Sequence, residues 1–389
     1  MNKSTLYYIW LTQGIGYCTT KVKYLYNLYP DIELLYKGGE QELRLCGIFT
    51  DNEISKLINT KLSVAEDILK RCNELNFKVY DISMPQYPQR LREIPDAPAV
   101  IYISGELPDF EEADTISIVG TRRATVYGIR TSMALGANLS KQGFIVVSGG
   151  ALGIDCAAHR GVLQSKGKAV CVLGCGIDYP YLLENKELRN AVASTGALVS
   201  EYPPACPAAS HNFPQRNRII SALSDGVIVV EAPKKSGSMI TVDFALKQGK
   251  DVFAVMGNVD SPYSTGSNQL IKDGAVPVTC WQDVYEYYRG ILESEPEIVP
   301  SDNQIKAIPS KNKNITAHSE NIPVPQHKEV PDLTEEERKV YLSLTDTPVH
   351  IDSVSEKVGL PPYVVIRAIS SLELKDLVVN TGGRLYAIK

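Results

Sequence analysis

Short runs rich in Val, Ile and Ala alternate with longer amphipathic stretches through the middle of the chain, and this alternation constrains the fold most. The runs predict strands at 115–119, 144–147, 168–173, 197–201, 226–231 and 251–255. Helical periodicity fills the gaps, at 126–142, 155–165, 184–194, 215–224 and 239–248. Strands that are apolar along almost their whole length are typical of a parallel sheet covered by helices on both faces. We therefore expect an α/β fold with an extended Rossmann-like, doubly wound sheet.

The composition on either side of this region predicts the domain organisation. Residues 1–75 form short helices with glycine hinges, 76–291 form the Rossmann-like domain with an added strand at 99–103, and 292–331 form a Pro- and Ser-rich flexible linker. Residues 332–389 have the pattern of three helices and a hairpin, which is a winged helix.

Two interpretations stay open for each of the terminal domains. The first hinge, Gly14 to Gly16, resembles half of a helix-hairpin-helix, a fold that binds the DNA backbone, but we favour a small helical packing or oligomerisation module with a glycine turn. The third helix of the winged domain carries only Arg367 and Lys375 as basic groups. These are few for a helix that binds in the major groove of DNA. That domain could therefore contact protein as readily as DNA.

Composition and charge narrow the class of protein. No stretch approaches the roughly 18 uninterrupted apolar residues of a membrane span, and the first residues lack the pattern of a secretion signal, so we expect a cytoplasmic protein. The eight cysteines include no CxxC pair, so no metal site is predicted. The net charge of −5 argues against nucleic acid, but residues 114–289 contain 17 Lys or Arg and 14 Asp or Glu, a local net of +3.

The loops that follow the predicted strands collect glycine, hydroxyl and cationic residues. In an open parallel sheet such loops meet at one edge, where helix N-termini bind anions, and an aromatic ring there can stack on a base. The residues concerned are Arg122, Arg123, Gly149, Gly150, Ala151, Gly153, Lys186, Phe213, Arg216, Asn217, Arg218, Ser236, Gly237 and Ser238. Such a series of turns suits a chain of phosphates better than one nucleotide.

Other residues near these loops have structural explanations. The turn at Gly149–Gly153 is not a strict GxGxxG and no acidic residue follows the next strand, so no nicotinamide cofactor is expected. Asp155 is expected to cap its helix and His159 to pack against that cap or against the sheet. Lys186 could hold a phosphate or be an ordinary exposed lysine.

Five ordered motifs resemble the DNA-processing protein A family (DprA, also called Smf). They are IVGTRRAT, SGGALGIDCAAH, FPQRNRIISALSDGVIVVEA, SGSMITVDFALKQGKDVFAVMGN and GSNQLIKDGA, between about residues 80 and 290. The resemblance implies a dimeric, non-enzymatic protein that binds single-stranded DNA, protects incoming strands and helps to load the RecA recombinase in natural transformation. It also implies that the loop residues named above contact DNA. Two departures are Met256 in place of a common proline, and Ser210 to Asn212 without a lysine that some members carry.

Two other functions remain as alternatives. A Rossmann-like nucleotide hydrolase acting on nucleoside monophosphates would use the SGSMIT turn with Asp243 as its acid, although the glycine pair of that class is missing. A pure protein adaptor would leave the arginine and glycine turns unexplained.

Overall fold

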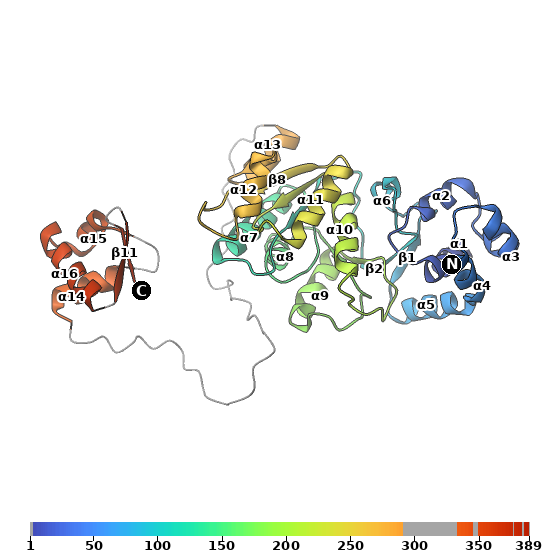
Figure 1. Cartoon of the computed structure of the whole chain (residues 1–389), viewed down its shortest axis with the longest axis horizontal. Helices are drawn as coiled ribbons and strands as arrows, with labels where there is room; N and C mark the ends of the chain where they lie inside the picture. The colour runs from blue at the N-terminus through green and yellow to red at the C-terminus, as the bar shows by residue number, and fades with distance from the viewer. Residues whose placement is uncertain (1–2, 291–332, 345–348, 376, 383–384, 389) are drawn as a thin grey trace, which may run out of the picture. The chain divides into compact units, whose positions relative to one another are not determined.

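The computed structural model describes residues 3–290, 333–344, 349–375, 377–382 and 385–388 (Figure 1). These residues fall into two compact units, one within 1–310 and one within 311–389. The predicted linker, 292–331, lies outside the described residues. No helix in the described part of the chain is both long and apolar enough to span a membrane.

The first unit is built on a nine-stranded sheet with the order β1-β2-β6-β5-β4-β3-β7-β8-β9. Its strands are β1 (Lys78–Asp81), β2 (Val100–Gly105), β3 (Thr115–Val119), β4 (Ile145–Ser148), β5 (Ala169–Leu173), β6 (Ala197–Ser200), β7 (Gly226–Val229), β8 (Asp251–Val255) and β9 (Val276–Val278). The strands from β6 to β9 pair in parallel, whereas β2 is antiparallel to both β1 and β6. The expected α/β doubly wound fold is confirmed.

Alternate strand residues enter two apolar clusters, one on each face of the sheet. One cluster takes in α7 (Val126–Lys141), α8 (Ile154–Gln164), α9 (Lys186–Thr195) and α13 (Trp281–Arg289). The other takes in α10 (Asn212–Ala222), α11 (Gly237–Lys247) and α12 (Thr265–Lys272). A short helix, α6 (Gln89–Glu93), precedes β2, and a 3-10 turn, η1 (Leu183–Asn185), precedes α9.

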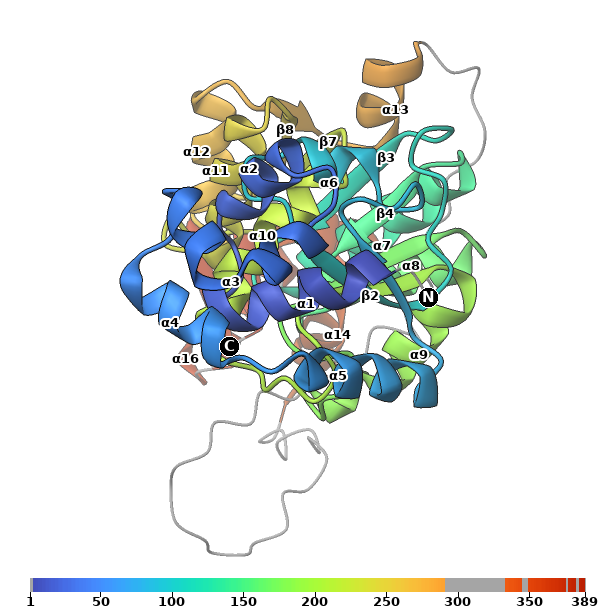
Figure 2. The same cartoon turned by 90° about the vertical axis from the view of Figure 1, so that its right-hand side faces the viewer.

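The first helices of the chain belong to the same unit as the sheet. They are α1 (Lys3–Ile15), α2 (Lys21–Leu28), α3 (Glu33–Leu45), α4 (Asp51–Asn59) and α5 (Leu62–Glu74), and they face the viewer in Figure 2. A Cβ on Gly14 would come within 2.3 Å of Leu57, so this glycine lets α1 pack closely on α4. The apolar cluster of these helices continues into the sheet. The boundary at residues 75 and 76 stays a prediction.

The six predicted strands of the parallel sheet and the added strand β2 all form. The structure also contains β1 and β9, which the sequence did not predict. The strand β9 has three residues, including Pro277, and pairs only with β8. A proline cannot donate a ladder hydrogen bond, so a strand of this kind is restricted to a sheet edge and gives a weak sequence signal.

The second unit is a winged helix, as expected. It contains α14 (Glu335–Ser343), β10 (Val349–His350), α15 (Ile351–Val358), α16 (Pro362–Leu374), β11 (Val378–Gly382) and β12 (Leu385–Ile388), with the sheet order β10-β12-β11. Both basic residues of the third-helix segment are ion-paired with α14, Arg367 with Glu336 at 2.6 Å and Lys375 with Glu337 at 2.9 Å. These pairs reduce the positive charge that the segment could offer to DNA.

Candidate nucleic-acid interface

A pocket of about 590 Å³, here called the edge pocket, lies at the carboxyl ends of β3, β4 and β7. The strand β3 has β4 on one side and β7 on the other, so the pocket sits where the chain reverses direction across the sheet. Doubly wound sheets bind their ligands at such a point. The predicted site residues that line the pocket are Arg122, Arg123, Ala151, Phe213, Arg216, Asn217, Ser236, Gly237 and Ser238.

Arg122 and Phe213 come from different loops and meet in the edge pocket. The guanidinium carbon of Arg122 lies 5.4 Å from the centre of the Phe213 ring, within the range of a cation–π contact. Phe213 is half-buried in the first turn of α10, and its ring centre is 5.1 Å from that of Tyr181. A cation and aromatic faces therefore lie side by side in the pocket.

Two glycines of the predicted turn after β4 permit close approach between segments. A Cβ on Gly149 would lie 2.7 Å from the guanidinium of Arg216. Gly153 has a φ of +83°, and a Cβ there would come within 2.4 Å of the carbonyl oxygen of Thr121. Gly153 thus supports the loop that carries Arg122.

Side chains of the chain itself occupy the backbone amides that we expected to receive an anion after β3 and β4. The carboxylate of Glu231 accepts hydrogen bonds from the backbone N–H and the hydroxyl of Thr125, at 2.9 and 2.6 Å. The carboxylate of Asp155 accepts from the N–H groups of Gly149 and Ala151, at 3.1 and 3.3 Å. The prediction that Asp155 caps its own helix is therefore wrong, because its acceptors serve the preceding turn. An anion at this edge would therefore contact side chains rather than these amides.

The edge pocket is lined by four cations and one carboxylate among the described residues. The cations are Arg122, Arg123, Arg216 and Lys235, and the carboxylate is Asp155. Burial raises the pKa of Asp155 to about 6, although the charge of Arg216 and the two amide hydrogen bonds oppose this shift. Near neutral pH the pocket carries excess positive charge, and protonation of Asp155 would increase it.

Arg216 forms the floor of the edge pocket rather than an exposed arm. Its side chain is 4% exposed and donates to the carbonyl oxygens of Gly149, at 2.8 Å, and of Val172. Burial lowers the pKa of this guanidinium. Asn217 also contributes to the pocket wall and donates to the carbonyl oxygen of Gly237 at 3.2 Å. These bonds join the start of α10 to β4, β5 and α11.

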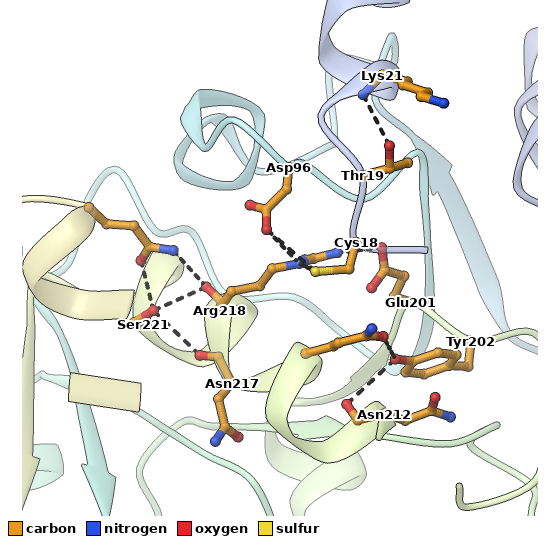
Figure 3. A network of polar contacts seen from close by, with 12 residues as sticks. Cys18, Thr19, Lys21, Asp96, Glu201, Tyr202, Asn212, Asn217, Arg218 and Ser221 are labelled. Atoms are coloured by element: carbon orange, nitrogen blue, oxygen red, sulfur yellow. Dashed lines mark hydrogen bonds and ion pairs between the residues drawn. The ribbon is translucent and has the colours of Figure 1, made fainter. Parts of the chain in front are cut away.

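Arg218 does not reach the edge pocket, contrary to the expectation that it would lie beside Arg216. Its side chain is completely buried, 2.6 Å from Glu201 and 3.3 Å from Asp96 (Figure 3). Its Nε also donates to the sulfur of Cys18, in the segment between α1 and α2, at 3.3 Å. Residues two apart on a helix face different directions, so Arg216 and Arg218 could not share one site. Arg218 joins the N-terminal segment to the sheet.

Lys186 lies at a different pocket, of about 320 Å³, which also contains Arg189. His159, which was expected to pack against the cap of its helix or the sheet, is 1% exposed, and burial lowers its pKa to about 4, so its ring is neutral. Asp243, the acid of the hydrolase alternative, is exposed and is not among the residues that line the edge pocket.

Sequence reasoning missed the roles of Glu231 and Asp155 as internal partners of the backbone amides. The available signal was the position of Glu231 at the carboxyl end of the predicted strand 226–231, because that end meets the neighbouring loop at the edge of the sheet. No sequence signal identified Arg189, whose burial depends on the packing of α9.

Comparisons with known proteins agree with this architecture. The family model described as DNA recombination-mediator protein A matches residues 78–289, and the model of the DprA winged helix domain matches residues 324–384. The DNA processing protein DprA of Bacillus subtilis is 38% identical over 231 residues, which cover 59% of this chain and 78% of that protein.

Two further relatives extend the match to more of the chain. Protein Smf of Synechocystis sp. is 30% identical over 393 residues, which cover 99% of both chains. The X-ray structure of DNA processing protein A from Streptococcus pneumoniae has a TM-score of 0.64 at 31% identity and covers 73% of this chain and 98% of that one. The chain therefore belongs to the DNA recombination-mediator protein A family.

Proposed function

We propose that the edge pocket binds single-stranded DNA independently of its sequence. The observation that carries this proposal is the contact between Arg122 and Phe213, which pairs a cation with an aromatic ring in an open pocket. A nucleotide of a single strand offers both a phosphate and the face of a base, and every base has such a face. A duplex keeps its bases stacked inside, so it could not use the ring.

The charge of the pocket supports a ligand with several phosphates. The four lining cations come from three separate segments, after β3, in α10 and before α11, and Arg122, Arg123 and Lys235 are exposed. Neutralisation of successive phosphates by such cations releases counterions, which makes affinity depend on salt. The chain as a whole has a net charge of −5, so this local concentration of cations favours binding at one edge only.

We further propose that the protein protects incoming strands and helps to load RecA in natural transformation and homologous recombination. The family's description as a recombination mediator and the names of the DNA processing relatives support this role. This role requires the protein to bind single-stranded DNA but not to catalyse a reaction on it. The homodimer that the resemblance implies also stays a prediction.

The test is a competition between oligo-dT and a duplex of equal length for the full chain, with the mass of the complexes measured by light scattering. We expect oligo-dT to bind more tightly and the mass to correspond to two copies of the chain. Equal or tighter binding of the duplex would contradict the single-strand proposal. A mass of one copy would contradict the dimer alone.

The matched variants are Arg122→Gln, in the pocket, and Lys247→Gln, an exposed cation at the opposite end of α11. Loss of affinity is expected only in the first, by about 1.5 to 3 kcal/mol for one charge-assisted contact. Equal effects of the two changes would place the binding surface elsewhere.

A further inference from the structure

A second pocket, here called the α9 pocket, has a volume of about 320 Å³ and lies beside the first turns of α9. Its lining includes Lys186, Arg189 and Asn190 from α9, Tyr179 from the preceding loop, and Phe77 from the segment before β1. Lys186 and Asn190 are exposed at its rim, whereas Arg189 is buried. The pocket therefore has a cationic interior, a polar rim and aromatic walls.

Arg189 is the feature that requires explanation. Its side chain is only 8% exposed and lines the α9 pocket, and no hydrogen bond or ion pair joins it to another described residue. Its nitrogens are not among the fully enclosed unpartnered atoms, so the guanidinium is accessible from the pocket. A buried charge without a partner is costly, and proteins normally pair or hydrogen-bond such a group. Arg189 thus lacks an anionic partner within the described part of the chain.

The one carboxylate that lines the α9 pocket, within the part of the chain that the structure describes, has other partners. Asp178 accepts from the backbone N–H of Ala205 at 2.7 Å and lies 3.5 Å from the guanidinium of Arg71. It therefore leaves the charge of Arg189 uncompensated. An anion from outside the chain would complete the site, with Lys186 at its rim.

The α9 pocket and the edge pocket lie on either side of one loop. Tyr181 contacts Phe213, which lines the edge pocket, while Tyr179, Pro180 and Leu183 on either side of Tyr181 line the α9 pocket. A polymer that fills the edge pocket and passes over this loop would reach the second set of cations. A separate small anion would have no need of such continuity.

We propose that the α9 pocket is a second phosphate-binding subsite, which takes a backbone phosphate of the same single strand that occupies the edge pocket. This inference rests on the proposed function. Arg189 and Lys186 bind the phosphate oxygens, and Tyr179 offers a ring beside them. The edge pocket alone holds a short strand, and the α9 pocket contributes only when the strand is long enough to cross the loop.

The test is the affinity of the full chain for a series of oligo-dT lengths, measured for the wild type, Lys186→Gln and Arg189→Met. We expect the shortest strands that bind to be held equally by all three proteins. Above a threshold length, each variant should bind about tenfold more weakly or worse than the wild type. The salt dependence of long-strand binding should also become shallower by about 0.7 in log–log slope for each lost phosphate contact. Lys247→Gln is the matched control and should behave as the wild type at every length.

Thermal unfolding separates a binding role of Arg189 from a structural one. Removal of an unpaired buried charge should leave the Tm of the free protein unchanged or raise it. A lower Tm for Arg189→Met would indicate a structural role and overturn the assignment. Loss of affinity at all lengths, or at none, would overturn it as well.

A separate measurement with thymidine monophosphate distinguishes the strand from a free nucleotide as the source of the phosphate. Binding of the mononucleotide that Lys186→Gln abolishes, without any change for long strands, would make the pocket a nucleotide site and contradict the proposal. Failure of the wild type to bind any oligonucleotide would instead refute the proposed function itself. Wild-type binding with indifferent variants would refute only the second subsite.

Discussion

Replacement of Arg218 by Met should destabilise the protein without affecting the binding site. Arg218 is fully buried and is paired with Glu201, which is 4% exposed. Removal of one partner from a buried ion pair typically costs about 3 to 5 kcal/mol, because the other charge is left uncompensated. Asp96 is 22% exposed and can be solvated, so Glu201 should dominate the cost.

The pH dependence of this cost follows from Glu201. Burial already raises the pKa of Glu201, even beside Arg218. In Arg218→Met the buried carboxyl of Glu201 can avoid its unpaired charge by taking up a proton. Because the pKa of a Glu in the unfolded chain is near 4.3, this protonation costs about 4 kcal/mol at pH 7 and about 1 kcal/mol at pH 5. A folded-state pKa above the unfolded one favours the folded state at low pH and loses that advantage as the pH rises. The deficit of the variant should therefore shrink as the pH falls from 7 to 5.

Urea unfolding at both pH values measures this deficit, with oligo-dT binding measured on the folded protein. The double variant Arg218→Met/Glu201→Leu should recover most of the lost stability, because it removes both charges. Arg123→Met, an exposed arginine of the edge pocket, is the matched control and should lose affinity while it keeps its stability. The reasoning fails if Arg218→Met unfolds within about 1 kcal/mol of the wild type at pH 7, or loses affinity while it stays stable.

Three further changes test the edge pocket. Phe213→Ala should weaken oligo-dT binding by about 1 to 3 kcal/mol in fluorescence anisotropy, whereas Phe213→Tyr should retain it, because only the ring is needed for stacking; equal losses would exclude stacking. Affinity for oligo-dT should rise as the pH falls through about 6, because Asp155 is then protonated and no longer repels phosphate. Asp155→Asn should remove this pH dependence, and a rise that persists in the variant would assign it to another group. Gly153→Ala should weaken binding of oligo-dT, because position 153 has a φ of +83° and an added Cβ would collide with the carbonyl oxygen of Thr121, so that the Arg122 loop must move. An unchanged affinity would show that this loop tolerates displacement.

The sheet could be predicted because its strands carry their own signal. Runs such as TISIV are buried along their whole length, and such runs are typical of strands in a parallel sheet that helices cover on both faces. The edge strands β1 and β9 lack this signal. The strand β1 is KVYD and is mostly half-buried, so its pairing with β2 is determined by the tertiary structure.

The position of the binding loops could also be predicted, because the carboxyl ends of parallel strands must meet at one edge. The direction of individual side chains could not. Arg216 and Arg218 have the same chemistry, but the turn of α10 sends one to the floor of the edge pocket and the other to Glu201. Another partner of Arg218, Cys18, lies between α1 and α2 and is 200 residues away in sequence, so this contact depends on how the N-terminal helices pack against the sheet.

The salt dependence of oligo-dT binding tests the central claim most directly, because it counts the phosphates that the edge pocket neutralises. For the wild type we expect affinity to fall steeply with salt, and for the double variant Arg122→Gln/Arg123→Gln we expect the log–log slope to become shallower by about 1.4. An affinity that does not depend on salt, or a slope that the double variant leaves unchanged, would contradict the binding of a DNA strand at this edge.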